Sequence, residues 1–188
     1  MTLDGSILIW IQENLRNSFL SSFIVPYSLS GNYAIPWFIV VIVLLIFKKT
    51  RKIGVLALIS MAVAFCINDF ILKNLIARPR PFLEIPELMT LVKRPSSYSC
   101  PSGHTAIAFG FAVSILMNAK KRYGFIALFF ALLMGFSRMY VGVHYPSDVL
   151  LGLLLGSTVA ILVSVFGNRI LRRKHIREDK GSVNESEA

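Results

Sequence analysis

Residues 53–76 have the sequence IGVLALISMAVAFCINDFILKNLI, a long apolar run whose few polar residues, Asn68, Asp69, Lys73 and Asn74 among them, gather near its end. A membrane-spanning helix needs ~20 mostly apolar residues, so this run predicts a span. Comparable runs at residues 33–47, 102–119, 123–140 and 147–170 predict four more. With 55% hydrophobic residues and a mean hydropathy of +0.64, the chain is too apolar for an ordinary soluble domain.

The N-terminal residues are apolar but interrupted by polar side chains such as Gln12, Glu13 and Arg16. Residues 1–27 therefore predict an amphipathic helix that lies in the membrane interface or spans it, followed by a turn at residues 28–32. The predicted fold is all-α, a polytopic membrane helix bundle with five to six transmembrane helices. It has one membrane domain, residues 1–170, and a disordered basic cytoplasmic tail, residues 171–188.

The chain has a net charge of +10, and the positions of its basic residues indicate the topology of the predicted spans. Basic residues gather between the first and second spans, between the third and fourth, and around and after the end of the fifth. Basic loops stay in the cytoplasm, so the odd number of spans places the other loops outside. The sequence has no basic face with interleaved aromatic residues, which argues against nucleic acid as a partner. The expected surroundings are a lipid bilayer, and the sequence predicts no oligomeric state.

Three short polar motifs interrupt the apolar chain, and this topology places all three on the outer side. The first is Lys73, six intervening residues, then Arg80 and Pro81. Lys73 is costly near the end of an apolar helix unless it is paired or hydrated, for example by Asp69 one turn earlier. Arg80 between two prolines suits two-point contact with phosphate oxygens. Arg78 is either a second phosphate contact or a solvated side chain.

The second motif is Pro101-Ser102-Gly103-His104. Ser102 is a good N-cap for the third span, and Gly103 allows a ligand to approach the backbone closely. The free N–H groups of a helix N-terminus bind anions. Beside such a site, His104 can donate a proton. The alternative interpretation is an ordinary helix cap.

The third motif is Ser137-Arg138, five intervening residues, His144, three more residues and Asp148. Pro146 and Ser147 resemble a helix start, which places Asp148 in its first turn, within reach of His144. A carboxylate that holds one imidazole nitrogen makes the other a better nucleophile. The alternative is a structural His–Asp pair. Zinc is a further alternative for these side chains, but three converging cations would repel a metal and would hold a phosphate.

These three motifs, in this order and at these spacings, resemble the signature of the type 2 phosphatidic acid phosphatase superfamily of membrane lipid phosphatases. The resemblance implies that His144 is the nucleophile that becomes phosphohistidine and that Asp148 orients it. It implies that His104 protonates the leaving group and then activates water. By the same resemblance the phosphate would be held by Lys73, Arg80, Ser102, Gly103 and Arg138, with no metal and no cofactor.

The resemblance also implies a substrate class, a lipid phosphate or diphosphate hydrolysed at the outer face of a bacterial plasma membrane. Undecaprenyl diphosphate is the expected substrate, because an outward site and a short chain fit an enzyme that recycles the cell-wall lipid carrier. The alternatives are phosphatidylglycerol phosphate, phosphatidic acid and diacylglycerol pyrophosphate. A phospholipid transporter, which would bind the phosphate without cleaving it, is the rival from another class.

Overall fold

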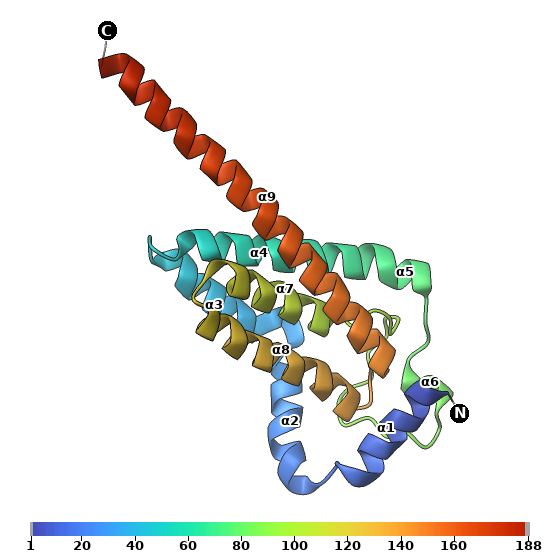
Figure 1. Cartoon of the computed structure of the whole chain (residues 1–188). Coiled ribbons are helices and arrows are strands. Elements are labelled where there is room, and N and C mark those ends of the chain that lie inside the picture. The colour runs from blue at the N-terminus through green and yellow to red at the C-terminus, as the bar shows by residue number, and fades with distance from the viewer. Residues whose placement is uncertain (1, 187–188) are drawn as a thin grey trace.

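Helix α7 (Gly103–Asn118) forms the centre of a helix bundle and packs against α4, α8 and α9 (Figure 1). The computed structural model describes residues 2–186 and the side chains of residues 2–172. Within these residues the regular structure is helical and contains no strand. The other elements are α1 (Leu3–Asn14), α2 (Ser18–Ser30), η1 (Asn32–Ala34), α3 (Ile35–Ile46), α4 (Arg51–Cys66), η2 (Ile67–Leu72), α5 (Lys73–Ile76), α6 (Pro81–Glu84), α8 (Lys121–Tyr140) and α9 (Pro146–Ser186).

Small residues allow α7 to occupy this central position. A Cβ atom added at Gly156 of α9 would lie 2.2 Å from the carbonyl oxygen of Ala106, and one added at Gly152 would lie 2.6 Å from that of Ser102. The two backbones are therefore nearly in contact, as in membrane helix pairs with small residues at the interface. This contact brings the start of α9 next to the start of α7.

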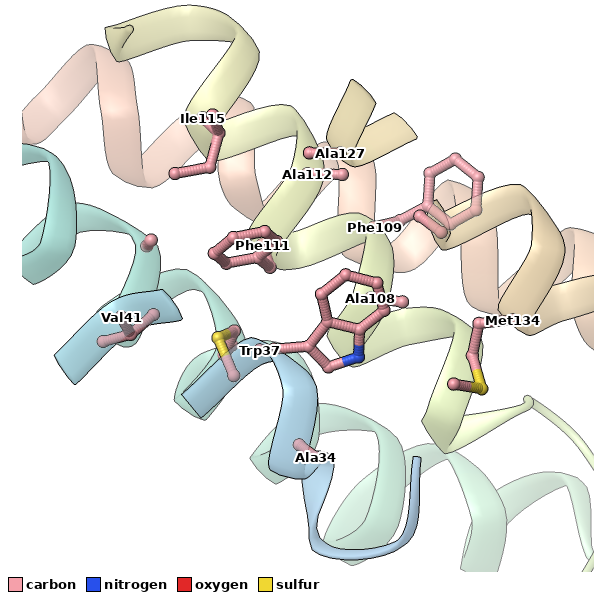
Figure 2. Close-up of a cluster of buried hydrophobic side chains, with 13 residues drawn as sticks. Ala34, Trp37, Val41, Ala108, Phe109, Phe111, Ala112, Ile115, Ala127 and Met134 are labelled. Atoms are coloured by element: carbon pink, nitrogen blue, oxygen red, sulfur yellow. The ribbon is translucent and has the colours of Figure 1, made fainter. Parts of the chain in front are cut away.

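The main hydrophobic core lies between α3, α4, α7 and α8 (Figure 2). Trp37 of α3 stacks on Phe111 of α7 with ring centroids 5.3 Å apart, and Met134 of α8 is fully buried in the same cluster. Many large apolar side chains on the outer surface are exposed, such as Phe129 and Leu154, as expected for helices that face lipid. Burial thus supports the membrane bundle predicted from composition.

The structure confirms a membrane helix bundle but does not confirm the predicted count of five to six spans. Three helical segments are long and apolar enough to cross a membrane, 51–84, 121–140 and 146–172. Helices α2 and α3 make a fourth if the two, bent by 72°, count as one span. Helix α7, predicted as a full span, is a shorter apolar helix of 16 residues. It is covered by its neighbours, so its length does not have to match the thickness of the bilayer.

The N-terminal prediction was wrong in its details. Residues 1–27 do not form one amphipathic helix, because Asn17 begins a new helix and its side chain accepts a hydrogen bond from the N–H of Leu20. Helix α2 then continues through the turn expected at residues 28–32 as far as Ser30. The sharp change of direction falls at Tyr33 and Ala34, which both adopt left-handed backbone angles.

The C-terminal segment also differs from the prediction of a disordered tail. Helix α9 continues without interruption from Pro146 to Ser186 and projects beyond the bundle (Figure 1). Residues 171–180 contain no glycine or proline and include several good helix formers, which explains why the backbone helix can propagate past the bundle. Residues 187 and 188 of the predicted tail lie outside the described residues.

Candidate active site

One polar pocket collects most of the predicted site residues. It has a volume of about 200 Å³ and lies where α5 ends, α7 begins and α8 leads into α9. Six of the eight predicted residues line it: Lys73, Arg80, Gly103, His104, Arg138 and His144. The other two, Ser102 and Asp148, are fully buried and are not among its lining residues. The fold therefore brings the three motifs together at one end of the bundle.

Lys73 reaches the pocket from an irregular helix. The α4–α5 helix widens into a π-helical segment, η2, immediately before Lys73. Such segments are frequent at functional sites because they redirect side chains. The ammonium group of Lys73 lies 2.5 Å from Oδ1 of Asp69, and Asn68 donates a hydrogen bond to the other oxygen of that carboxylate. The predicted Lys73–Asp69 pair is present, and Lys73 lines the pocket at the same time.

Arg80 is fixed by the backbone around it. The chain leaves α5 through Ala77 in a left-handed conformation, and α6 begins at Pro81 directly after Arg80. The Arg80 guanidinium donates to the carbonyl oxygens of Ser97 and Val143 at 2.8 and 2.9 Å. These contacts hold the guanidinium rigidly at the wall of the pocket.

Arg138 enters the pocket from the last turn of α8. It donates to the hydroxyl of Ser28 at 2.7 Å, and its Nε has no partner within the described chain. Arg138 is 3% exposed and Arg80 is 4% exposed, and among the described residues neither has a carboxylate at ion-pair distance. Buried charges are normally paired, so two buried guanidiniums without an anion indicate a site for an anionic ligand.

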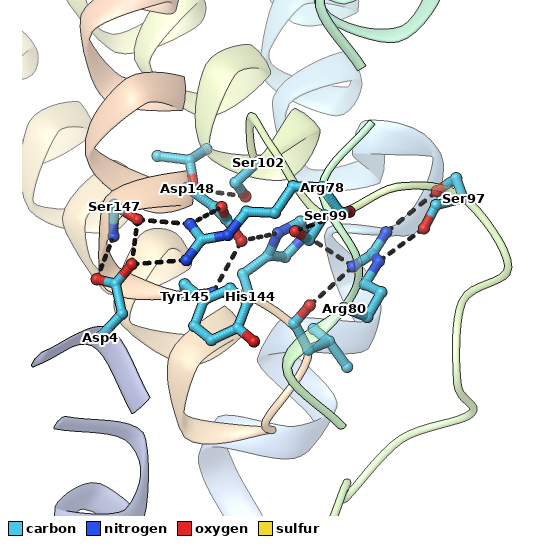
Figure 3. A network of polar contacts seen from close by, with 12 residues as sticks. Asp4, Arg78, Arg80, Ser97, Ser99, Ser102, His144, Tyr145, Ser147 and Asp148 are labelled. Carbon is cyan, nitrogen blue, oxygen red and sulfur yellow. Dashed lines mark hydrogen bonds and ion pairs between the residues drawn. The ribbon is translucent and has the colours of Figure 1, made fainter. Parts of the chain in front are cut away.

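The contacts of His144 define its tautomer. Its Nε2 lies 3.1 Å from a guanidinium nitrogen of Arg80, which can only donate, so Nε2 carries the lone pair. The proton therefore belongs to Nδ1, which faces Oδ2 of Asp148 at 3.5 Å (Figure 3). A lone pair on Nε2 at the wall of the pocket is the arrangement required of a nucleophile.

Electrostatics keep this imidazole neutral. Burial lowers the pKa of His144 well below its ordinary value, and the charges of Arg80 and Arg138 lower it further. The contact with Asp148 acts in the opposite direction but does not outweigh them. A neutral imidazole retains its nucleophilic lone pair at neutral pH.

The start of α7 supplies backbone donors. Gly103 and His104 belong to its first turn, where N–H groups lack helical partners. Ser102 occupies the predicted N-cap position, but its hydroxyl accepts a hydrogen bond from Thr105 at 2.9 Å and makes no cap hydrogen bond. His104 lies 3.1 Å through Nε2 from the side-chain oxygen of Asn32. Of the three residues predicted for an anion site at this helix start, Gly103 and His104 line the pocket and Ser102 does not.

Several residues of the site were not predicted. Asn32, Ser97 and Lys93 also line the pocket, and Ser28 holds Arg138. They come from η1, from the loop between α6 and α7 and from α2, and no sequence motif marks them. A larger omission is Asp4, which contacts Arg78 from the first turn of α1 (Figure 3). Arg78 was predicted to contact phosphate or to be solvated. Its side chain is 27% exposed, does not line the pocket and donates a hydrogen bond to Asp148.

A metal was the alternative ligand considered for the histidine and aspartate side chains of the site. Among residues 2–172, no three His, Cys, Asp or Glu side chains converge in a way that could hold an ion. His104 and His144 instead share the pocket with Lys73, Arg80 and Arg138. This set of groups suits a phosphate.

Comparisons with known proteins agree with this geometry. The model of the PAP2 superfamily matches residues 53–172. An undecaprenyl-diphosphatase of Sulfolobus acidocaldarius is 40% identical over 126 residues, which are 67% of this chain and 61% of that protein. The chain thus spans about three fifths of the length of that relative. A decaprenylphosphoryl-5-phosphoribose phosphatase of Mycobacterium tuberculosis is 35% identical over 150 residues, 77% of this chain and 79% of that protein.

A solved structure shares the architecture. The crystal structure of a transmembrane PAP2 type phosphatidylglycerolphosphate phosphatase from Bacillus subtilis superposes with a TM-score of 0.73 at 28% identity. The match covers 89% of this chain and 85% of that one. The family model spans more than half of the chain, and the three motifs that it contains meet in one pocket. The chain belongs to the PAP2 superfamily.

Proposed function

We propose that the protein is a lipid phosphatase that works through a phosphohistidine intermediate. Nε2 of His144 attacks the terminal phosphorus, the bond from phosphorus to the lipid oxygen breaks, and His104 gives that oxygen a proton. Water, deprotonated by His104, then attacks the phosphorus, the P–N bond breaks and inorganic phosphate leaves. Lys73, Arg80, Arg138 and the first N–H groups of α7 stabilise the charge on the phosphoryl oxygens throughout.

One observation carries the choice of a lipid. The polar pocket adjoins a second, mostly apolar cavity of about 550 Å³ between η1, α3, α4 and α7. Lys73, Gly103 and His104 line both cavities. The apolar cavity continues along the exposed side of α4 past Phe65 and Ala62. A substrate with a phosphate head and a hydrocarbon chain fits the two cavities together, whereas a soluble phosphate ester would leave the apolar one empty.

For the lipid itself we propose undecaprenyl diphosphate, hydrolysed to undecaprenyl phosphate. The 40% identity with a protein named undecaprenyl-diphosphatase supports this choice. The other candidates are phosphatidylglycerol phosphate, phosphatidic acid and diacylglycerol pyrophosphate. The similarity to a phosphatidylglycerolphosphate phosphatase makes the first of these the main competitor.

We further propose that no metal takes part and that the site faces outward from a bacterial plasma membrane. The cations of the pocket already supply the charge stabilisation that a metal would give. The pocket lies at one end of α7 and α8, and the basic residues 120–122 lie at the opposite end of these helices. The basic residues 48–52 lie on that side as well, because Thr50 and Lys120 line one cavity. Basic loops on the cytoplasmic side would leave the pocket outside.

Release of inorganic phosphate from purified protein in detergent, with EDTA present, tests the chemistry. The panel contains undecaprenyl diphosphate and the three alternative lipids, with H144A as the inactive control. We expect release that survives the chelator, is greatest for the polyprenyl diphosphate and is absent in H144A. Preference for a glycerolipid would overturn the substrate, and loss on chelation restored by one divalent ion would overturn the metal-free mechanism. No release from any lipid would contradict hydrolysis and favour transport.

Single cysteines test the orientation. In a background that lacks Cys66 and Cys100, Tyr98→Cys lies in the loop on the pocket side, and Lys49→Cys lies between α3 and α4. Both positions are exposed. On intact cells, a membrane-impermeant maleimide should label Y98C, and should label K49C only after lysis. The reverse pattern would place the pocket in the cytoplasm.

A further inference from the structure

The first turn of α1 is connected through Arg78 to Asp148, the carboxylate that faces His144. Oδ2 of Asp4 accepts a hydrogen bond from Nη2 of Arg78 at 2.8 Å and another from the hydroxyl of Ser147. Oδ1 of Asp4 accepts from the backbone N–H of Ser147 at 3.3 Å. Residue 4 is thereby joined to the beginning of α9, 143 positions later in the chain (Figure 3).

Arg78 connects Asp4 to Asp148. Its Nη1 donates to Oδ1 of Asp148 and to the hydroxyl of Ser147, at 2.8 and 2.7 Å. Its guanidinium carbon lies 3.8 Å above the centre of the Tyr145 ring. These contacts hold the guanidinium on the side of Asp148 away from the pocket. The other oxygen of Asp148, Oδ2, accepts a hydrogen bond from the backbone N–H of Tyr145 and faces Nδ1 of His144.

We propose that Asp4 and Arg78 are positioning residues for the nucleophile: Arg78 fixes the Asp148 carboxylate, and Asp4 neutralises Arg78. The N-terminal helix α1 is then part of the catalytic apparatus, although it lies outside the three sequence motifs. The inference rests on the proposed function, because it assigns these residues to the attack by His144.

The need for Asp4 follows from the charges around His144. Arg80 from the loop before α6 contacts its ring, and Arg138 of α8, Lys73 of α5 and His104 of α7 share its pocket. Asp148 of α9 is the carboxylate that faces it. An unneutralised Arg78 would cancel the charge of Asp148 and lower the basicity of the imidazole. With Asp4 in place, the group of Asp4, Arg78 and Asp148 keeps one net negative charge behind the ring.

A purely structural role for Asp4 makes a different prediction from a positioning role. If Asp4 only attaches α1 to the bundle, its removal lowers the amount of folded enzyme and leaves the pH profile unchanged. If Asp4 balances Arg78, its removal moves the acid limb of kcat/KM, which reports His144, toward lower pH. Removal of the Arg78 charge moves the same limb toward higher pH. The negative charges of Asp4 and Asp148 are then no longer offset by a cation, and they stabilise the protonated form of His144. Opposite shifts separate the two roles.

The experiment measures kcat, KM and the pH dependence of kcat/KM for D4N, R78Q, R78K and the double variant D4N/R78Q. The matched control is E13Q, which removes the charge of an exposed acid on the same helix that has no ion pair within the described chain. We expect D4N and R78K to lower kcat about 10- to 100-fold with KM little changed, the usual effect of losing a group that orients a reacting one. The acid limb should move down in D4N and up in R78Q, and in the double variant it should return toward that of the unmodified enzyme.

Several results would overturn the proposal. One is kcat within twofold of that of E13Q in both D4N and R78K, and another is a common shift of the acid limb in D4N and R78Q. If D4N yields no folded protein, R78K and R78Q still decide the question, since R78K keeps the charge and R78Q removes it. Activity of the unmodified enzyme that is lost in H144A is measured alongside. If the unmodified enzyme shows no such activity, the proposed function is refuted. If it shows this activity and D4N and R78K have the same kcat as the unmodified enzyme, only the present inference is refuted.

Discussion

Nδ1 of His144 and Oδ2 of Asp148 lie 3.5 Å apart, slightly too far for a normal hydrogen bond. Each group is held by another partner. Oδ2 accepts from the N–H of Tyr145 at 2.9 Å, and Nε2 of the imidazole contacts Arg80 at 3.1 Å. In the proposed reaction, a phosphate that takes over the Arg80 contact would free the ring to move toward Asp148.

This relationship predicts the effect of Asp148→Asn. The amide keeps the shape of the side chain but removes the charge that holds the Nδ1 proton, so kcat should fall roughly 10²- to 10⁴-fold. Phosphate release by D148N compared with that of E87Q, which neutralises an exposed acid outside the pocket, measures the effect. Equal rates in the two variants would mean that Asp148 serves only the fold.

His104→Ala should affect monoester and diphosphate lipids differently. An alcohol leaving group has to be protonated as its bond breaks, whereas a lipid phosphate leaving group has a second pKa of about 6 and departs more readily as an anion. The loss in kcat should therefore be larger for phosphatidic acid than for a lipid diphosphate. H144A should abolish turnover of both. A uniform loss in H104A would argue against its role as the acid.

The pH profile follows from the burial of His144. Burial and two neighbouring guanidiniums lower the pKa of this imidazole, so the nucleophile stays neutral as the pH falls through the ordinary histidine value of 6.5. The acid limb of kcat/KM, measured from about pH 4 to pH 8, should lie below that value. An acid limb at or above 6.5 would contradict a buried, cation-flanked nucleophile.

Filling the apolar cavity should separate lipid substrates from soluble ones. Ala62 of α4 lines this cavity and is exposed, so Ala62→Trp would occupy it without disturbing the core. KM for a long-chain lipid phosphate should rise, and turnover of a short water-soluble phosphate ester should change little. Ile59→Trp, at an exposed position of the same helix outside the cavity, is the control. Identical kinetics in the two variants would remove the argument for chain binding there.

Gly156→Ala tests the packing that aligns α9 with α7. The added methyl group would lie 2.2 Å from the carbonyl oxygen of Ala106, so the two helices must move apart, at a cost of about 1–3 kcal/mol. Thermal unfolding in detergent should show a lower Tm and reduced activity. Gly167→Ala on the same helix meets only the end of the flexible Leu56 side chain below 3 Å and should behave like the unmodified protein. A similar Tm in both variants would mean that this contact adapts without cost.

Much of the site could be predicted from the sequence because its chemistry is local. Lys73 and Arg80, Gly103 and His104, and His144 and Asp148 each lie within eight positions of one another, so each pair could be recognised in the sequence, and the resemblance to a family signature implied their roles. The helical fold followed from apolar runs, since a backbone in lipid has to satisfy its own hydrogen bonds. Helix ends were predicted less accurately, because the break at Asn17 depends on a side-chain cap and not on hydropathy.

The sequence by itself determined the helical class and most of the basic and imidazole side chains that line the polar pocket, because each follows from residue type and short spacing. The tertiary structure alone decided which distant residues complete the site. Asp4 meets Arg78 and Ser147, and Ser28 meets Arg138, only because helix packing brings together segments separated by 74 to 143 positions. No periodicity or motif encodes such contacts, since they depend on where whole helices lie relative to one another.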